Sequence, residues 1–179
     1  MATMTATANC FVTTYKIGNE QGYSTGKRFE LGDYSDKAEF MAAAIDYAKN
    51  ELGDTDPEIA FPDYETNFDS LNFIDEYGID DKVWDVMALK GNDLEIMLAY
   101  LENSDMIDND IRQTVDHAQS NYIAHWECEH EFARDQLRAR GIFDLMPNEV
   151  MDNLNLTACA NQFATDMMVS DDGHYFNNQ

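Results

Sequence analysis

Basic residues are scarce in this chain of 179 residues, which has 11 Lys and Arg residues against 35 Asp and Glu residues and a formal net charge of −24. A surface of that sign repels nucleic acid and anionic lipid, so we expect neither as a partner. No run of about 18 consecutive apolar residues occurs either, which excludes a membrane-spanning helix. Residues 1–9 contain no Lys, no Arg and no apolar run, so we expect no signal peptide and a cytoplasmic location.

Cysteine is also rare, and the sequence lacks the common catalytic motifs. Cys10, Cys128 and Cys159 are odd in number and far apart, which argues against a disulfide framework and against a zinc knuckle. There is no phosphate-binding Gly-rich loop, no nucleophile elbow and no Cys–His–Asn pattern. We therefore expect reduced thiols, no enzymatic activity and no cofactor.

Apolar residues are nevertheless plentiful: 44% of the chain is hydrophobic and 12% is aromatic. A strongly acidic chain with few aromatic residues usually stays disordered, but this one has enough apolar surface to fold. It must then hold its carboxylates on a defined surface, where they repel one another. A cationic partner, a bound metal ion or a very salty solvent would each compensate for that repulsion, and a halophilic origin therefore stays an alternative explanation of the charge.

The local patterns predict an α+β fold. In the first third, we expect strands at residues 10–15, 27–31 and 58–61, a Gly-rich loop between the first two, and a helix from Ser35 to Gly53. In the middle third, we expect four short helices: residues 72–77, 81–90, one opening at 92 or 93, and 108–118. The last third suggests strands at 122–126 and 174–176, helices at 128–140 and from Pro147, and an apolar helical stripe from Leu156 to Met167.

Several acidic segments resemble metal sites without completing one. Glu127 and His130 form a single Glu-x-x-His pair, whereas di-iron bundles need two such pairs and two further Glu residues. His125-Trp126-Glu127 is similar to the opening of a zinc-deaminase motif, but the required Pro-Cys-x-x-Cys is missing. Three aspartates lack the spacing, Gly and terminal Glu of an EF-hand: Asp105, Asp108 and Asp110. The sequence therefore predicts no metal site.

The middle of the chain is its most acidic part. Residues 61–120 hold fifteen acidic and three basic residues, a net charge of −12, and only Lys82, Lys90 and Arg112 are available there to neutralise the acids. Acidic residues at helix starts complement the helix macrodipole, which explains some of the fifteen but not all. Adjacent carboxylates such as Asp80 and Asp81 usually mark a solvated face, because a catalytic pair needs one carboxyl group in an apolar pocket.

Four segments form an ordered set that spans nearly the whole chain. They are Phe11–Tyr15 with Asn19, Glu20, Gly26 and Arg28–Leu31; Asp56–Glu65, which contains Asp-Tyr-Glu; Glu131–Ala133 with Gly141, Asp144 and Pro147; and Asp172–Phe176. In this order they resemble the ArdA antirestriction family, DNA-mimic proteins carried by conjugative elements and phages. The chain departs from the family pattern at Thr66, where a Gly normally follows Asp-Tyr-Glu, and at residues 155–160, which lack the family's carboxylates.

The resemblance implies an elongated homodimer whose subunits are chains of three small domains. These would be an N-terminal α/β domain with a small antiparallel sheet (1–62), an acidic helical domain (63–118) and a C-terminal α+β domain that dimerises (119–179). It also implies that the carboxylates imitate the phosphates of bent B-form DNA. The partner would be a type I restriction–modification enzyme, or another DNA-binding defence protein, in a bacterial cell.

Phosphate contacts supply most of the sequence-independent affinity of DNA-binding proteins, so a mimic needs charge rather than base edges. The expected phosphate substitutes are Asp63, Glu65, Asp69, Asp75, Glu76, Asp80, Asp81, Asp85, Asp93, Glu95, Glu102, Asp105, Asp108, Asp110, Asp116, Glu127, Glu129, Glu131 and Asp135. The alternative function is an acidic interaction module or chaperone for other basic, nucleic-acid-binding proteins, which needs the same charge without DNA-like spacing.

Overall fold

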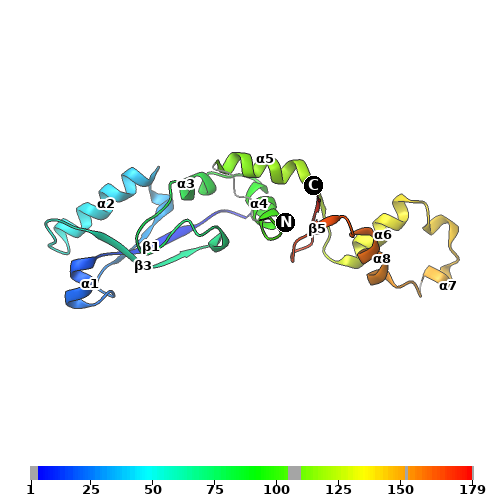
Figure 1. Cartoon of the computed structure of the whole chain (residues 1–179), viewed down its shortest axis with the longest axis horizontal. Helices are drawn as coiled ribbons and strands as arrows, with labels where there is room; N and C mark the ends of the chain where they lie inside the picture. Colours follow the sequence, from blue (N-terminus) through cyan, green and yellow to red (C-terminus); the bar gives the residue numbers. More distant parts are fainter. Residues whose placement is uncertain (1–3, 105–109, 152, 179) are drawn as a thin grey trace. The chain divides into compact units, whose positions relative to one another are not determined.

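The computed structural model describes residues 4–104, 110–151 and 153–178. The chain divides into two compact units, Met1–Leu94 and Glu95–Gln179 (Figure 1). The described residues form eight α-helices and two small antiparallel sheets of three strands each, which confirms the α+β class. The arrangement in three domains stays a prediction, and its boundary at 62/63 falls inside a strand that runs from Ile59 to Thr66.

The first unit is built on a sheet with the strand order β2-β1-β3. Its strands are β1 (Ala8–Thr14), β2 (Lys27–Glu30) and β3 (Ile59–Thr66), and β1 pairs antiparallel with both neighbours. Side chains alternate across a strand, so Cys10 and Val12 are fully buried whereas Asn9 and Phe11 lie on the other face. One face of the sheet therefore belongs to the core and the other is open to solvent.

A short helix replaces the Gly-rich loop expected after the first strand. It is α1 (Tyr15–Gln21), and its N-cap is Thr14, whose side chain accepts a hydrogen bond from the backbone N–H of Ile17. The helix ends at Gly22, which has a φ of 93°, a conformation that suits glycine. The expected loop is present only from Gly22 to Gly26, because the Thr14 N-cap stabilises a helix of about two turns that includes Gly18.

The long helix of the first unit, α2 (Lys37–Asn50), packs on β1 and β3. Its N-cap is Asp36 rather than the predicted Ser35, because the Asp36 carboxylate accepts the backbone N–H of Glu39. The helix buries an aromatic cluster in which Phe40 contacts Phe29, Phe61 and other rings at centroid separations near 6 Å. The core of this unit therefore lies between α2 and the covered face of the sheet.

The rest of the first unit is less helical than the sequence suggests. Short 3₁₀ turns cover Leu31–Asp33 and Asp69–Leu71, and α3 spans only Lys82–Met87. The helix predicted at 72–77 is absent there, since Ile74 pairs with Ile79 across a tight turn instead. The carboxylate of Asp75 accepts the N–H groups of Tyr77 and Gly78, which favours the turn over a helix.

The helices of the second unit follow the predicted order closely. They are α4 (Asp93–Leu101), which begins at the end of the first unit, α5 (Ile111–Asn121), α6 (Glu129–Ala139), α7 (Asn148–Met151) and α8 (Leu156–Phe163), with a 3₁₀ turn at Phe143–Leu145. The predicted N-cap Asp108 lies outside the described residues, and Asp110 caps α5 by accepting the N–H of Arg112.

The sheet of the second unit has the strand order β4-β6-β5. Its strands are β4 (Tyr122–His125), β5 (Met167–Val169) and β6 (His174–Asn177). Met167 belongs to β5, so the predicted helical stripe ends earlier, at Phe163. The ring of Tyr175 stacks on Phe132 of α6 at 4.2 Å, which joins the sheet to the α6–α8 layer. Within the described parts of the chain, no helix is both long and apolar enough to cross a membrane.

Candidate functional site

The carboxylates singled out from the sequence are mostly on the surface. In the first unit, all the expected phosphate substitutes up to Asp85 are exposed: Asp63, Glu65, Asp69, Asp75, Glu76, Asp80, Asp81 and Asp85. In the second unit, the exposed ones are Glu102, Asp110, Asp116, Glu127, Glu129, Glu131 and Asp135. Asp93 and Glu95 are half-buried in α4, and Asp105 and Asp108 lie outside the described residues. The candidate site is therefore an extended set of surface acids on each unit.

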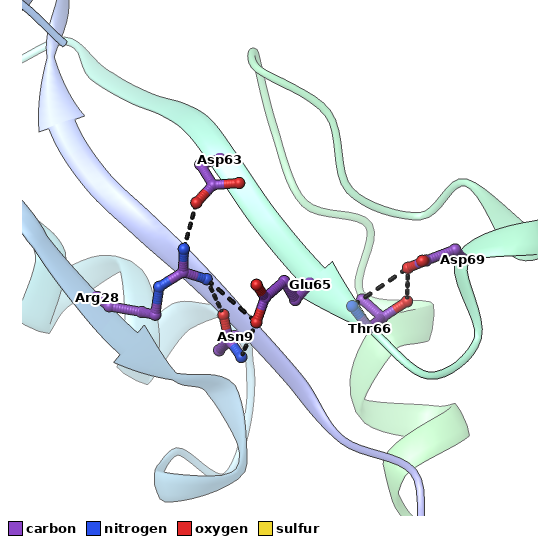
Figure 2. Close-up of polar contacts among 6 residues, drawn as sticks. All are labelled: Asn9, Arg28, Asp63, Glu65, Thr66 and Asp69. Atoms are coloured by element: carbon purple, nitrogen blue, oxygen red, sulfur yellow. Dashed lines mark hydrogen bonds and ion pairs between the residues drawn. The ribbon is translucent and has the colours of Figure 1, made fainter. Parts of the chain in front are cut away.

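Two of these acids lie beside an arginine on the open face of the first sheet (Figure 2). Arg28 of β2 and Asp63 of β3 both pair with Phe11 of β1, which places them in one row across the sheet. The Arg28 guanidinium reaches across the central strand to the Asp63 carboxylate, and its other nitrogen donates to Asn9 and lies 3.6 Å from Glu65 Oε2. This arrangement links three strands through one basic side chain.

Arg28 corrects the expectation that only the three basic residues of the middle segment could neutralise the acids there. The guanidinium comes from β2, outside residues 61–120, and reaches Asp63 because both edge strands pair with β1. The side chains of Asp63 and Glu65 are still 58% and 71% exposed, so each presents carboxylate oxygen to solvent. Surface ion pairs of this kind contribute about 0–1 kcal/mol, and they orient charges more than they bury them.

The end of β3 shows what Thr66 does at the position where the resembling family has a glycine. Asp69 accepts hydrogen bonds from both the backbone N–H and the hydroxyl group of Thr66 (Figure 2). These bonds tie the 3₁₀ turn at Asp69–Leu71 to the strand. The Thr66 side chain therefore holds an exposed carboxylate in place, which a glycine could do only through its backbone.

Further along the first unit, turns fix the acids around an exposed aromatic ring. Both N–H···O distances to Asp75 Oδ1, from Tyr77 and Gly78, are 2.8 Å. Asp80 Oδ1 accepts the N–H of Lys82 at 2.9 Å at the start of α3. The Tyr77 side chain projects from this turn and is 79% exposed. Backbone bonds of this kind leave the second oxygen of each carboxylate available to a partner.

In the second unit, several acids are oriented by neighbouring side chains around α6. Glu129 accepts the hydroxyl group of Thr157 at 2.6 Å, and Asp135 accepts the indole N–H of Trp126 at 3.0 Å. Asp135 also pairs with Arg138 at 3.1 Å, one turn along the same helix. Glu129 and Glu131, in the first turn of α6, also stabilise the helix because they complement its macrodipole.

Glu95 has a different environment from the other candidate acids. It is half-buried, and its Oε1 lies 3.3 Å from Nε2 of His174, a side chain only 4% exposed. Burial lowers the pKa of His174, and the neighbouring ring of His125, 4.7 Å away, lowers it further. The Glu95 carboxylate raises the pKa of His174 and so opposes this shift. Glu95 therefore has a partner in the interior of the second unit in addition to contributing to the surface charge.

The Glu127–His130 pair does not have the geometry of a helix-borne metal motif. Helix α6 begins at Glu129 with Cys128 as its N-cap, so Glu127 precedes the helix. His130 Nε2 instead contacts the Thr157 hydroxyl group at 3.1 Å. Among the residues with described positions, no group of three or more His, Cys, Asp and Glu side chains could hold a metal ion.

Comparisons with known proteins add no relative to this picture. No family model, curated protein or solved structure matches the chain.

Sequence reasoning missed two residues that contact the acids of the first sheet, Arg28 and Asn9, and the exposed ring of Tyr77. A signal for Arg28 was present, because it lies next to the buried Phe29 on a strand that the pattern predicted, whereas Asn9 belongs to the start of β1, just before the strand predicted at residues 10–15. Their meeting with Asp63 and Glu65 depends on strand order, which alternation alone does not give.

Proposed function

We propose that this protein is a non-enzymatic DNA mimic of the ArdA type. In this proposal it occupies the DNA-binding groove of a type I restriction–modification enzyme in a bacterial cell and inhibits it competitively. The supporting observation is that the candidate acids from Asp63 to Asp85 are all exposed. Arg28, which lies outside this segment, pairs with the first two of them, Asp63 and Glu65.

Electrostatics gives this surface its affinity for a DNA-binding protein. A groove that binds DNA is lined with Lys and Arg, and phosphate contacts supply most of its sequence-independent affinity. Asp81 and Asp85 are exposed and make no ion pair with any described basic side chain. Carboxylates in that state attract the cationic groove as phosphates do, and they carry no base edges that would restrict the choice of enzyme.

Fixed carboxylates improve such a mimic because fewer side chains are ordered on binding. Asp69, Asp75 and Asp80 each accept hydrogen bonds from nearby backbone N–H groups, which limits their rotamers before any partner arrives. Ordering a flexible side chain at an interface costs about 0.5–1.5 kcal/mol. A folded mimic also avoids the cost of bending DNA, which is of order 1–6 kcal/mol for a short site.

A displacement experiment tests the proposal. A type I restriction–modification enzyme is bound to fluorescent duplex DNA, and the protein is titrated in at low and at moderate salt. The proposal predicts displacement at low salt and, when the protein is titrated into the enzyme without DNA, an affinity that falls as salt increases. Absence of displacement at both salt concentrations would remove this class of target and leave the chaperone alternative, which a pull-down of basic proteins would then examine.

From the resemblance we also propose a homodimer formed through the C-terminal domain. Light scattering of the purified protein over a range of concentrations measures this directly. A mass near twice 20.4 kDa supports the dimer. A monomer at every concentration would contradict the dimer without affecting the electrostatic part of the proposal.

A further inference from the structure

The second unit contains a pocket with both acidic and aromatic side chains in its lining, and a volume of about 370 Å³. Two segments form it. The residues around the start of α6 contribute Glu127 and Glu129, and the turn between β5 and β6 contributes Asp171 and Asp172. None of the described residues that line it is Lys or Arg, and the residues outside the described ranges include neither. The pocket therefore attracts cations.

Most carboxylates of this pocket have no partner within the described parts of the chain. The side chains of Glu127, Asp171 and Asp172 are exposed and form no hydrogen bond or ion pair with any described residue. Glu129 differs, because its Oε1 lies 3.6 Å from Nε2 of His130. At least one acid from each segment is therefore available to pair with a positively charged ligand.

A hydroxyl group in the pocket also lacks a partner. Tyr175 lines the pocket and is only 4% exposed, yet its hydroxyl group forms no hydrogen bond with any described residue, and its oxygen remains accessible to solvent. Burial raises the pKa of Tyr175, and the neighbouring Glu129 and Cys128, which also line the pocket, raise it further. The hydroxyl group is therefore protonated, lies near these two residues and offers its lone pairs to an N–H donor in the pocket.

The spacing of the acids favours a ligand with separated charges. Among the described residues, no group of three or more His, Cys, Asp and Glu side chains could hold a metal ion, so the four carboxylates do not converge on one ion. Apolar side chains line the same pocket, namely Trp126, Tyr175 and Val169, and the Trp126 and Tyr175 rings meet edge to face at 5.0 Å. Methylene groups pack on such side chains, and an aromatic ring attracts an ammonium group. A short aliphatic chain with an ammonium group at each end meets these conditions.

We propose that this pocket binds an aliphatic diamine or polyamine, whose ammonium groups pair with acids of the two segments while its methylene groups lie against Trp126 and Tyr175. The volume lies within the ~300–1,000 Å³ typical of small-molecule pockets. A Lys or Arg side chain of a protein partner has a single charge and would leave the acids of one segment unpaired. The binding does not depend on the proposed DNA mimicry, although Glu127 and Glu129 also belong to the candidate phosphate substitutes.

Nuclear magnetic resonance titration of the full chain, without any enzyme, tests the proposal. Putrescine, spermidine, butylamine and Mg²⁺ are each added at an ionic strength of about 0.15 M, and the signals of the Trp126 indole N–H and the Gly173 backbone N–H are followed. The expected result is a saturable shift with putrescine or spermidine, and binding about tenfold weaker for butylamine, which has one ammonium group. No saturable shift with either polyamine, equal binding of butylamine, or an equal shift with Mg²⁺ would each overturn the proposal, the last by showing counterion attraction only.

Variants separate the pocket from the general acidity of the protein. Tyr175→Phe removes only a hydroxyl group that has no partner in the described fold, so it should weaken polyamine binding several-fold and leave the free energy of unfolding unchanged. Glu127→Gln combined with Asp171→Asn should weaken binding about tenfold or more. The matched control is Asp116→Asn combined with Asp166→Asn, which removes the same charge from exposed positions of this unit outside the pocket. Equal losses in the two double variants, or unchanged affinity in Tyr175→Phe, would overturn the assignment.

Discussion

The guanidinium of Arg28 and the carboxylate of Asp63 come from opposite edge strands of one sheet and meet across the central strand. The ion pair fixes the position of an acid and also reduces its charge. In the DNA-mimic proposal, fixing the position of the carboxylate strengthens target binding, whereas reducing the net negative charge weakens it. The exposure of the pair indicates which effect is larger. Because Asp63 is more than half exposed, we expect the loss of charge to matter more than the loss of order.

The first prediction follows from that balance. Arg28→Gln should tighten binding to a DNA-binding target by about two- to fivefold at low salt, because Asp63 and Glu65 regain their full charge. The displacement assay measures the change. Lys27→Gln is the matched control, since it removes the same charge from β2 but Lys27 lies over the rings of Phe29 and Tyr47. Weaker binding of Arg28→Gln would show that Arg28 serves mainly to position the acids.

The second prediction concerns the exposed ring at the turn before α3. Exposed tyrosines are frequent energetic centres of protein interfaces, and Tyr77 stands among acids on a turn fixed by Asp75. Tyr77→Ala should weaken target binding by about 1 kcal/mol or more while leaving the salt dependence unchanged, because no charge is lost. Tyr77→Phe should keep most of the affinity. Wild-type affinity in Tyr77→Ala would exclude this turn from the interface.

A third prediction concerns stability, through a hydroxyl group at the end of β1. Thr14 Oγ1 donates to Asp54 Oδ2 at 2.8 Å and accepts the N–H of Ile17 at 3.2 Å, and Asp54 is only 3% exposed. Thr14→Val keeps the shape but leaves both groups without this partner, so the free energy of unfolding should fall by about 1–3 kcal/mol. Denaturant titration measures this, with the exposed Thr7→Val as a control expected to change little. An unchanged unfolding free energy would contradict the account.

A fourth prediction concerns pH and the interior of the second unit. His174 faces Glu95 of α4, His125 and Tyr122 of β4, and the Asp172 region of the preceding turn. Its pKa is lowered in the folded protein, first by burial, so below its ordinary value of 6.5 the unfolded chain takes up the proton more readily. The stabilising effect of the neutral ring is present above that pH and is lost as the pH falls toward the lowered value.

The measurement is the difference in unfolding free energy between the wild type and His174→Gln, at about pH 7.5 and about pH 5.5. Because the many carboxylates are the same in both proteins, their own titration cancels in this difference. The wild type should lose stability relative to the variant at the lower pH. A difference that does not vary with pH would show that His174 has an unperturbed pKa.

Strong local patterns determined what could be predicted of the fold. The strand at residues 10–15 and the helix at 128–140 were predicted within a few residues, because alternation and helical spacing are clear there. The prediction of a helix at 72–77 was wrong, because the Asp75 carboxylate accepts the backbone N–H groups of Tyr77 and Gly78 and so stabilises a turn. At this position, side-chain hydrogen bonds to the backbone outweigh the helix propensity of the sequence.

The candidate site was predictable in kind rather than in detail. Surface exposure of acids such as Asp81 and Asp85 follows from their charge, because an unpaired carboxylate is rarely buried. The pairing of Glu95 with His174 could not be foreseen, since 79 residues separate them and only the contact of α4 with the second sheet brings them together. The sequence therefore predicts that the acids are charged and exposed, but it does not predict which side chains lie beside each of them.

The central claim is that the position of the acids, and not only their number, determines target binding. The most direct test compares two triple charge reversals that change the net charge equally. One reverses Asp80, Asp81 and Asp85, and the other reverses Asp46, Glu51 and Glu58, which are exposed in the same unit but outside the candidate set. Both variants are titrated against the enzyme–DNA complex at one low salt concentration. The account predicts a large loss of displacement for the first and a much smaller loss for the second, and equal losses in the two variants would contradict it.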